Sequence, residues 1–582
     1  MKLEKLIVHN FRGLKGNENK ISFDKSNIIF LIGKNNNGKS TFLHAYDFFV
    51  SPKKRATIED FSDFNTTEKI EIEGIFISEP DDSKDKDLSK GEPSWIENWV
   101  DKNNRISIKK TWSNINEEGK KQTYSPKEGQ YIEGGFGGFD TLLKKYAPSA
   151  IMINAVTSSE DLEKLINDII TKNHIKKLET EYSEDYDNII TSLENLKGKI
   201  SNAEDITKIN SDMTNFFKKT FPEYSLKIAP IQDSGVDITK TLKSTHGIKV
   251  GKSDNNKSQN SAENIVSDYN DENFHSLDKN GHGIMRQAFF SFLSTYGAEI
   301  KKEEKEYLIL FEEPELYLHP SAIFSLRDQL YELAENSPYQ IMCATHSPLM
   351  IDTSKTHSSL IRLEKERQNS ITKTRQVDFD LYTSEEKDYL QMMNRFNPHI
   401  CESFFADEVI LVEGDTEAII YRELIKKFYS DYREVFVLNT GSKSNMVFYQ
   451  KILTHFGIKH VVVHDVDSKT VKINKGKETE REQTNAMWTY NQKIWDQIVT
   501  SNTEIKGISR RFVHNRNFED AHDYKYDFKK GKPLSAFEFA KQIERDSKIP
   551  SIRFLDDFFG EGIINFSPED IEEIIREKDT EE

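Results

Sequence analysis

The sequence predicts an α/β protein made of two successive units, each built around a parallel β-sheet. Two observations carry this prediction. An apolar segment at 26–33 meets a glycine and is followed by a helical pattern at 39–50. From residue 408 onward, apolar segments again alternate with helical ones. Strands that alternate with helices in this way form parallel sheets covered on both faces, and 582 residues are enough for more than one core.

The composition is typical of a globular cytoplasmic protein. Hydrophobic residues make up 36% of the chain, and no apolar run approaches the roughly 20 residues needed to cross a bilayer. The N-terminus lacks a signal-peptide pattern, and Cys343 and Cys401 alone cannot form a disulfide framework or a zinc cluster. We therefore expect a cytoplasmic location and no membrane contact.

The net charge of −17 argues against a protein that coats DNA through bulk positive charge. DNA contact would have to come from a local basic stretch, or through metal ions that bridge carboxylates to phosphate. Residues 506–532 contain eight Lys or Arg against four acids. This stretch either follows a phosphate backbone or forms an ordinary solvated surface.

The first 80 residues predict strands around one phosphate-binding loop. KLEKLIVHNF and residues 66–77 alternate apolar and polar residues, as half-buried strands do. GKNNNGKST at 33–41 matches G-x-x-x-x-G-K-[ST] between a strand and a helix. In such a loop Lys39 supplies a positive charge to the outer phosphates, and the Ser40 hydroxyl binds Mg²⁺. The predicted ATP-binding residues are Gly33, Asn36, Gly38, Lys39, Ser40 and Thr41.

Two later strands end in residues suited to phosphoryl transfer. YLILFEEPE (307–315) carries Glu312 and Glu313, and YQIMCATHSP (339–348) carries His346. In phosphate-loop enzymes the first acid holds Mg²⁺ through water and the second polarises the attacking water. His346 either contacts the γ-phosphate or is a strand-end histidine without a role.

Two segments between the phosphate loop and these strands bear on assembly. Gly281 and Gly283 precede an amphipathic helix whose backbone N–H groups could cap a phosphate. Residues 159–220 predict a helical insertion, which is either an ordinary amphipathic hairpin or an oligomerisation arm. Its predicted apolar face consists of Ile189, Leu193, Leu196 and Ile200. The polar segment 251–273 predicts a surface loop.

The order of these motifs resembles the ABC-type ATPases of the SMC and RecF group. The sequences NFRGL, EEPELYLHP and THSP all look like that group. There, the glycine-rich helix start comes from a second subunit and closes over ATP. The resemblance therefore implies a homodimer or a higher even oligomer.

The second unit carries acidic residues where strands end. Glu413 follows an apolar strand and Glu417 lies on the next helical turn, while Asp465 and Asp467 end another strand. The carboxyl ends of parallel strands line one crevice, so these four carboxylates should meet. Carboxylates repel one another, and ligation by oxygen alone suits Mg²⁺ or Mn²⁺.

An E-G-x-x-E turn followed by D-x-D is similar to the Toprim fold. A Toprim unit behind an ATPase of this type resembles the OLD (overcoming lysogenization defect) family of nucleases. The resemblance covers an ATPase domain at 1–360 and a Toprim domain at 405–582, with a linker at 361–404. It implies two metal ions that activate water and cut DNA.

The resemblance also implies roles for individual residues. The expected catalytic residues of the Toprim site are Glu413, Asp465, Asp467 and Lys532, and those of the ATPase site are Glu313 and His346. The expected metal ligands are Glu413, Glu417, Asp465, Asp467, Ser468 and Glu519. Asp520 is the alternative to Glu519. Lys532 either stabilises charge on the cleaved phosphate or is a solvated lysine.

The function implied is an ATP-regulated, metal-dependent DNA endonuclease, by resemblance a prokaryotic antiphage or genome-maintenance effector. Relatives act alone, beside a helicase-like protein, or beside a reverse transcriptase element. Two alternatives remain. One is another Toprim reaction, such as primer synthesis or strand passage, although two lone cysteines argue against a primase zinc module. The other is an SMC-like ATPase that clamps DNA or scaffolds a complex with a non-cleaving Toprim domain.

Overall fold

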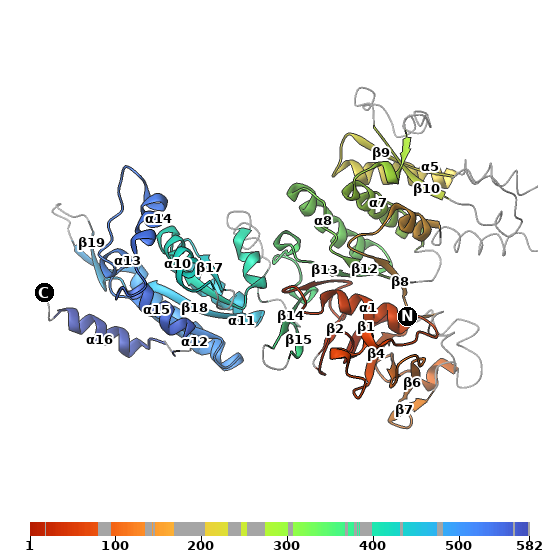
Figure 1. Cartoon of the computed structure of the whole chain (residues 1–582), viewed down its shortest axis with the longest axis horizontal. Helices are drawn as coiled ribbons and strands as arrows, with labels where there is room; N and C mark the ends of the chain where they lie inside the picture. The colour runs from red at the N-terminus through yellow and green to blue at the C-terminus, as the bar shows by residue number, and fades with distance from the viewer. Residues whose placement is uncertain are drawn as a thin grey trace, which may run out of the picture. The chain divides into compact units, whose positions relative to one another are not determined.

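The computed structural model divides the chain into two compact units (Figure 1). Unit 1 comprises Met1–Ile351 and Ser358–Thr374, and unit 2 comprises Asp352–His357 and Arg375–Glu582. The structure describes residues 1–579 apart from 18, 80–94, 134–142, 144–145, 168–203, 231–245, 253–273, 301–305, 367–369, 378–380, 382, 384–397, 431–434, 474–480, 561 and 563–564.

Unit 1 contains a six-stranded sheet with the order β15-β14-β3-β13-β12-β8. From β14 to β8 the neighbouring strands run parallel. The strands are β3 (Ile28–Ile32), β8 (Ser149–Ile153), β12 (Tyr307–Glu312), β13 (Tyr339–Ala344), β14 (Leu360–Lys365) and β15 (Thr372–Gln376). Most of β14 and all of β15 fall in residues 361–404, where we expected a linker. The buried side chains of Leu360, Ile361 and Leu363 draw β14 into the sheet.

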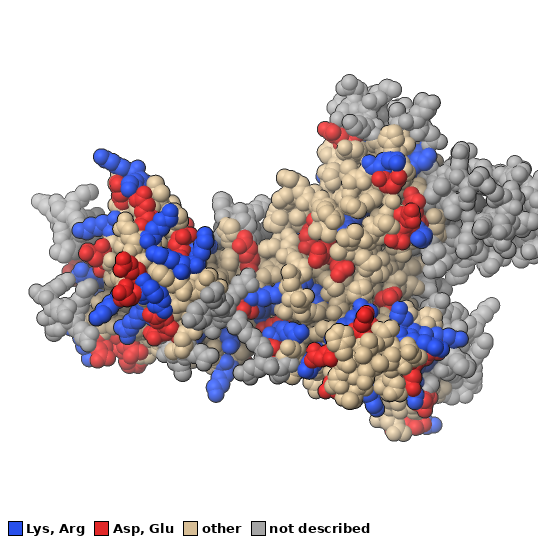
Figure 2. Space-filling model, viewed as in Figure 1, with Lys and Arg blue, Asp and Glu red and all other residues tan. Residues whose placement is uncertain are grey.

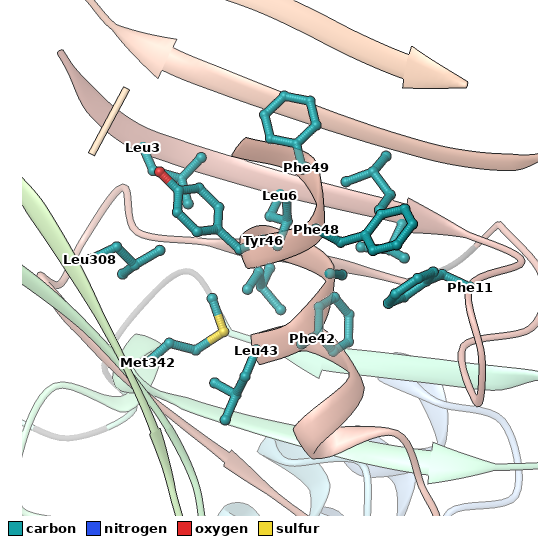
Figure 3. Close-up of a cluster of buried hydrophobic side chains, with 14 of the residues drawn as sticks. Leu3, Leu6, Phe11, Phe42, Leu43, Tyr46, Phe48, Phe49, Leu308 and Met342 are labelled. Carbon is teal, nitrogen blue, oxygen red and sulfur yellow. The ribbon is translucent and has the colours of Figure 1, made fainter. Parts of the chain in front are cut away.

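A second, antiparallel sheet of unit 1 has the order β2-β1-β4-β5-β6-β7. Its strands are β1 (Lys2–His9), β2 (Lys20–Ser22), β4 (Ile70–Ile77), β5 (Arg105–Trp112), β6 (Lys120–Ser125) and β7 (Gln130–Glu133). Helix α1 (Lys39–Val50) packs between the two sheets, with Leu6 of β1 on one side and Leu308 and Met342 on the other (Figure 3). Each such buried side chain contributes roughly 1.5–3 kcal/mol, so this core fixes the helix that follows the phosphate loop.

The rest of unit 1 contains helices, as the patterns at 159–220 and after Gly283 predict, and a small sheet that the sequence analysis did not anticipate. The antiparallel sheet β11-β10-β9 is made of β9 (Tyr224–Pro230), β10 (His246–Lys252) and β11 (Phe274–Ser276). The helices are α5 (Glu204–Lys218), α7 (His282–Ile300) and α8 (Pro320–Asn336). Within the predicted insertion at 159–220, residues 159–167 and α5 are helical. Ile189, Leu193, Leu196 and Ile200 lie outside the described residues, as do 253–273.

Unit 2 is built on a four-stranded parallel sheet with the order β17-β16-β18-β21. Its strands are β16 (Glu408–Val412), β17 (Val435–Asn439), β18 (Lys459–Asp465) and β21 (Ser509–His514), and β19 (Thr470–Ile473) pairs with β20 (Arg481–Thr484). The helices are α10 (Asp415–Phe428), α11 (Lys443–His455), α12 (Ala486–Glu504), α13 (Phe518–Ala521), α14 (Lys532–Gln542), α15 (Pro550–Phe559) and α16 (Pro568–Asp579).

Both faces of this sheet are covered, as the apolar runs predict. Ile410 and Val461 pack against α10, α14 and α15 on one face. Val409 and Val462 point the other way and are equally buried, and on α11 and α12 Met446 and Ile494 are buried too. Among the described helices, none has the length and apolar character needed to span a membrane.

Candidate functional site

The phosphate loop joins β3 to α1 and depends on two glycines. Gly33 (φ 137) and Gly38 (φ 91) have left-handed backbone conformations. A Cβ on Gly33 would collide with the carbonyl oxygen of Leu363, and one on Gly38 would lie 2.6 Å from Leu14 Cδ2. Lys39 Nζ donates to the carbonyl oxygens of Gly33 and of the next residue, both at 2.7 Å. Burial lowers the pKa of Lys39 to about 8. The loop is therefore already folded around its lysine.

The other predicted ATP-binding residues lie at the tip of the loop and at the start of α1. Asn36 is exposed with a φ of 63, at the tip of the loop. Ser40 and Thr41 lie in the first turn of α1 and are half-buried. The hydroxyl-bearing residues therefore sit at the helix N-terminus, where its partial positive charge favours a phosphate.

Glu312, Glu313 and His346 lie at the carboxyl ends of β12 and β13; β13 is next to β3 in the sheet order, and β12 follows β13. His346 Nε2 is 3.7 Å from Glu313 Oε1. Burial, with help from the charge of Lys39, lowers the pKa of His346 to about 4, so the imidazole is neutral at pH 7. The charge of Glu313 in turn offsets part of the lowering that burial imposes on the pKa of Lys39. These groups form one electrostatic unit beside the loop.

Two residues to which the sequence analysis gave no role position the segments that carry His346 and Glu313. Glu315 Oε1 accepts hydrogen bonds from Thr345 Oγ1 at 2.6 Å and from the backbone N–H of His346 at 3.1 Å. Arg286 of α7 donates to the carbonyl oxygen of Glu313 at 2.6 Å. Burial raises the pKa of Glu315 and lowers that of Arg286. The third acid of the E-E-P-E sequence was the signal that could have revealed Glu315.

The glycine-rich start of α7 faces solvent at its first position. A Cβ on Gly281 would meet nothing within 4 Å, whereas one on Gly283 would lie 3.0 Å from both Leu318 Cδ2 and the carbonyl oxygen of Tyr317. The ring of His282 stacks on that of Tyr317, with centroids 5.0 Å apart. Within the described part of the chain, no hydrogen bond joins Gly281 or Gly283 to the phosphate loop.

In unit 2, Glu413 and Asp465 lie at the carboxyl ends of adjacent parallel strands, β16 and β18. The backbone N–H of Asp465 donates to Glu413 Oε1 at 2.8 Å. Burial, and then the charge of Asp465, raises the pKa of Glu413 well above its usual range. Burial likewise raises the pKa of Asp465. Burial also raises the pKa of Glu417 to about 7, and the charges of Asp465 and Glu519 add to that shift.

Glu519 belongs to this carboxylate cluster, which we define as Glu413, Glu417, Asp465 and Glu519. Its charge raises the pKa of both Glu417 and Asp465, so it lies within their electrostatic reach. Asp520 is engaged elsewhere, because its Oδ2 accepts from Asn517 Nδ2 at 3.0 Å at the start of α13. Of the two late acids, Glu519 is therefore the one whose charge acts on Glu417 and Asp465.

Lys443, which the sequence analysis passed over, reaches both aspartates of the D-x-D motif. Its side chain is 0% exposed, and Nζ donates to Asp467 Oδ2 at 2.6 Å and to the carbonyl oxygen of Asp465. Asp467 has a φ of 63, which turns it out of line with β18. In the described residues, no three His, Cys, Asp or Glu side chains form a ready metal site. Asp467 is thus turned to an ammonium group rather than to the other acids. Only the GSKSN turn after β17 hinted at this lysine.

A buried histidine positions Asp465. His514 Nδ1 lies 3.3 Å from Asp465 Oδ1, and its Nε2 lies 3.0 Å from the hydroxyl of Tyr421. Burial lowers the pKa of His514 to about 3, so the ring is neutral. If the Tyr421 hydroxyl donates to Nε2, the ring proton is on Nδ1 and faces the carboxylate.

Ser468 and Lys532 are exposed, and neither makes a hydrogen bond to the carboxylate cluster in the described part of unit 2. Ser468 lines a cavity of about 540 Å³ together with Asp467, Thr470, Val471, Asn485, Arg516 and Asn517. Lys532 begins α14 and is exposed, and its Nζ is 5.7 Å from the centre of the Tyr526 ring. In the described part of unit 2, no hydrogen bond or ion pair joins Lys532 to the cluster. Two of the basic residues in the stretch 506–532 are already used within the fold, because Arg511 is fully buried and Arg510 pairs with Glu408 at 2.6 Å.

Two family models match the chain. The model described as AAA ATPase domain matches residues 1–351, and the model described as overcoming lysogenization defect protein-like, TOPRIM domain matches residues 404–467. The chain belongs to the OLD family. This membership and the α/β fold with an ATPase followed by a Toprim domain confirm what the motifs predicted.

Relatives of this OLD-family chain include two curated nucleases. The Old nuclease of Escherichia phage P2 is 26% identical over 494 residues, which span 80% of this chain and 77% of that protein. Endonuclease GajA of Bacillus cereus (strain VD045) is 26% identical over 498 residues, which span 82% and 77%. An SMC head bound to the C-winged helix domain of ScpA covers 66% of this chain and 100% of its own, at 13% identity and a TM-score of 0.40.

Proposed function

We propose that this chain is an ATP-regulated DNA endonuclease whose cleavage depends on divalent metal ions. Its family and its nuclease relatives support an ATPase-linked nuclease. The observation that carries the finer proposal is the carboxylate cluster at the carboxyl ends of β16 and β18. By its family, the chain would act as a prokaryotic antiphage effector.

The cluster suits Mg²⁺ or Mn²⁺. Its members are oxygen donors, and burial together with neighbouring acids raises the pKa values of Glu413, Glu417 and Asp465, as expected where carboxylates crowd together. Glu413, Glu417, Asp465 and Glu519 would hold the metal ions, with Asp467 and Ser468 beside them. Two bound ions would supply an activated water and would neutralise charge on the cleaved phosphate.

The chain's own residues prepare this site. His514 and the backbone N–H of Asp465 fix the two carboxylates that end β16 and β18. Lys443 supplies a positive charge that lowers the pKa of Glu413 and Asp465. Because metal ligands must be deprotonated, metal binding would release the protons that the raised pKa values hold on these acids.

The ATPase site would be completed by a second copy of the chain. Lys39, Ser40, Glu312, Glu313 and His346 would engage ATP and Mg²⁺ in one subunit. The exposed N-terminus of α7 at Gly281 is free to approach the nucleotide of another subunit. Two copies related by a two-fold axis complete two sites, which supports an even oligomer.

The test is cleavage of plasmid DNA with Mg²⁺ or Mn²⁺, with and without ATP. We expect the wild-type chain to cut, Glu413→Gln and Asp465→Asn to lose at least about 100-fold in rate, and Asp520→Asn to cut normally. Asp520→Asn is the matched control, because it removes a neighbouring acid outside the cluster. Normal cutting by the two cluster variants would contradict the proposal. A wild-type chain that retains DNA with ATP but never cuts would favour the clamp alternative.

A further inference from the structure

The loop between α13 and α14 presents aromatic side chains to solvent. Phe528 is 87% exposed and Tyr526 is 40% exposed, and Leu534 in the first turn of α14 is exposed as well. No other large hydrophobic side chain among the described residues is as exposed as Phe528. A patch of exposed apolar side chains on a folded protein often marks a binding surface.

The loop is ordered by its own hydrogen bonds. Asp527 Oδ1 accepts from the backbone N–H of Lys529 at 2.8 Å, and its carbonyl oxygen accepts from Lys530 and Gly531 at 3.0 Å. The backbone N–H of Asp527 donates to Ser535 Oγ at 3.0 Å. The acid of the loop is therefore used to build the turn, while the neighbouring Phe528 points into solvent.

The same loop is basic. Residues 525–534 contain four lysines and one acid in a chain whose net charge is −17. Lys525, Lys529 and Lys532 are exposed, and Lys532 Nζ lies 5.7 Å from the centre of the Tyr526 ring. Figure 2 shows Lys and Arg side chains over the α14 end of unit 2, with acidic side chains among them. Flat aromatic rings beside cations fit the bases and phosphates of a single nucleic-acid strand.

Both ends of the loop are attached to elements that carry cluster acids. The backbone N–H of Tyr524 donates to the carbonyl oxygen of Glu519 at 2.9 Å, and the buried Tyr524 ring packs 4.8 Å from that of Phe539 in α14. Lys427 of α10 donates to the carbonyl oxygen of Lys541 at 2.9 Å. Helix α10 also carries Glu417, so the loop is built into the frame of the carboxylate cluster.

We propose that Phe528 and Tyr526 form a stacking platform for unpaired bases of the DNA, with Lys525, Lys529 and Lys532 on the flanking phosphates. This inference rests on the proposed nuclease function and deepens it. Bases within an intact duplex offer no free face for stacking. The substrate class is therefore DNA with single-stranded character beside the cleavage site.

The test is fluorescence anisotropy of a labelled single-stranded oligonucleotide and of the matching duplex, in EDTA to prevent cleavage. We expect wild type to bind the single strand more tightly than the duplex. Phe528→Ala should weaken single-strand binding by at least about fivefold, the lower end for loss of one base–aromatic stack. Phe528→Trp should retain affinity, whereas Phe528→Leu should resemble alanine. Phe64→Ala is the matched control, because Phe64 is 65% exposed in unit 1.

The outcomes separate this inference from the function on which it rests. Unchanged single-strand affinity in Phe528→Ala, with wild type binding DNA, would overturn the platform alone. Full affinity in Phe528→Leu would also overturn it, because an apolar contact with a protein or a second copy needs no aromatic ring. A wild-type chain that binds no DNA would instead count against the proposed endonuclease. Equal melting temperatures of the variants would show that folding is unaffected.

Discussion

Lys443 shows how a single buried charge can organise an acidic site. Its ammonium group contacts Asp467 and the backbone of Asp465, and its charge opposes the upward pKa shifts of Glu413 and Asp465. Removing one partner of a buried ion pair leaves the other without compensation. The residue is therefore as much a part of the site as the acids are.

We predict that Lys443→Met destabilises metal-free unit 2 by about 3 kcal/mol. The substitution removes the ion-pair partner of Asp467 and increases repulsion among the acids. Urea unfolding in EDTA measures the effect. Lys451→Met is the control, because Lys451 is exposed on the same helix, α11. Equal unfolding midpoints for the two variants would show that Lys443 does not stabilise the cluster.

The raised pKa values predict a pH dependence of the metal-free protein. Glu413, Glu417 and Asp465 titrate above their unfolded values of about 4, with Glu417 near 7. Between the unfolded and the folded pKa values, the folded state binds more protons than the unfolded state. The free energy of unfolding therefore falls as pH rises from about 4.5 to about 7. Thermal unfolding in EDTA should show this fall. Glu413→Gln should flatten it, and a slope unchanged in that variant would contradict the assignment.

Among single residues, the sequence predicts those site residues that follow the end of a strand. It does not predict those that reach the site only through tertiary contacts. Glu413 and Asp465 follow buried strands, and a parallel sheet brings such positions together. Lys443, Glu315 and Arg286 act through contacts with segments that are distant in sequence. The third acid of E-E-P-E and the GSKSN turn were weak local signals for Glu315 and Lys443, and no periodicity or spacing singled out Arg286.

Among the elements, the phosphate loop depends on backbone shape more than on side chains. Gly33 and Gly129 both have positive φ, at 137 and 69, but only Gly33 lies against another strand's backbone, at Leu363. A methyl group on either glycine carries a backbone penalty, and at Gly33 it also collides. Gly33 therefore allows the phosphate loop to lie directly against β14.

We predict that Gly33→Ala weakens binding of a fluorescent ATP analogue by at least about tenfold, because the loop must move away from β14. Gly129→Ala should leave the affinity unchanged, since its Cβ meets nothing within 4 Å. Equal affinities for both variants would show that the close approach to Leu363 is not needed for nucleotide binding.

The elements also show where sequence patterns were insufficient. β3, β12, β13, β16 and β18 were predictable because each is a continuous apolar run in a buried parallel sheet. β14 and β15 were hidden in a charged segment, and the sheet β11-β10-β9 joins strands separated by long insertions. Such pairings are decided by tertiary packing rather than by local sequence.

For the whole molecule, one chain supplies one phosphate loop and one glycine-rich helix start. We predict an even oligomer, with ATPase units meeting through the start of α7. Light scattering at micromolar concentration, with and without a non-hydrolysable ATP analogue, measures the mass against 67.5 kDa per chain. A monomer under both conditions would refute the shared site.

The central claim is that the carboxylate cluster of unit 2 binds divalent metal, and calorimetric titration of Mn²⁺ into the full chain without DNA tests it most directly. We predict binding that is lost in Asp465→Asn and preserved in Asp520→Asn, with protons released on binding because Glu413, Glu417 and Asp465 have raised pKa values. Binding of equal affinity and stoichiometry in wild type and Asp465→Asn would contradict it.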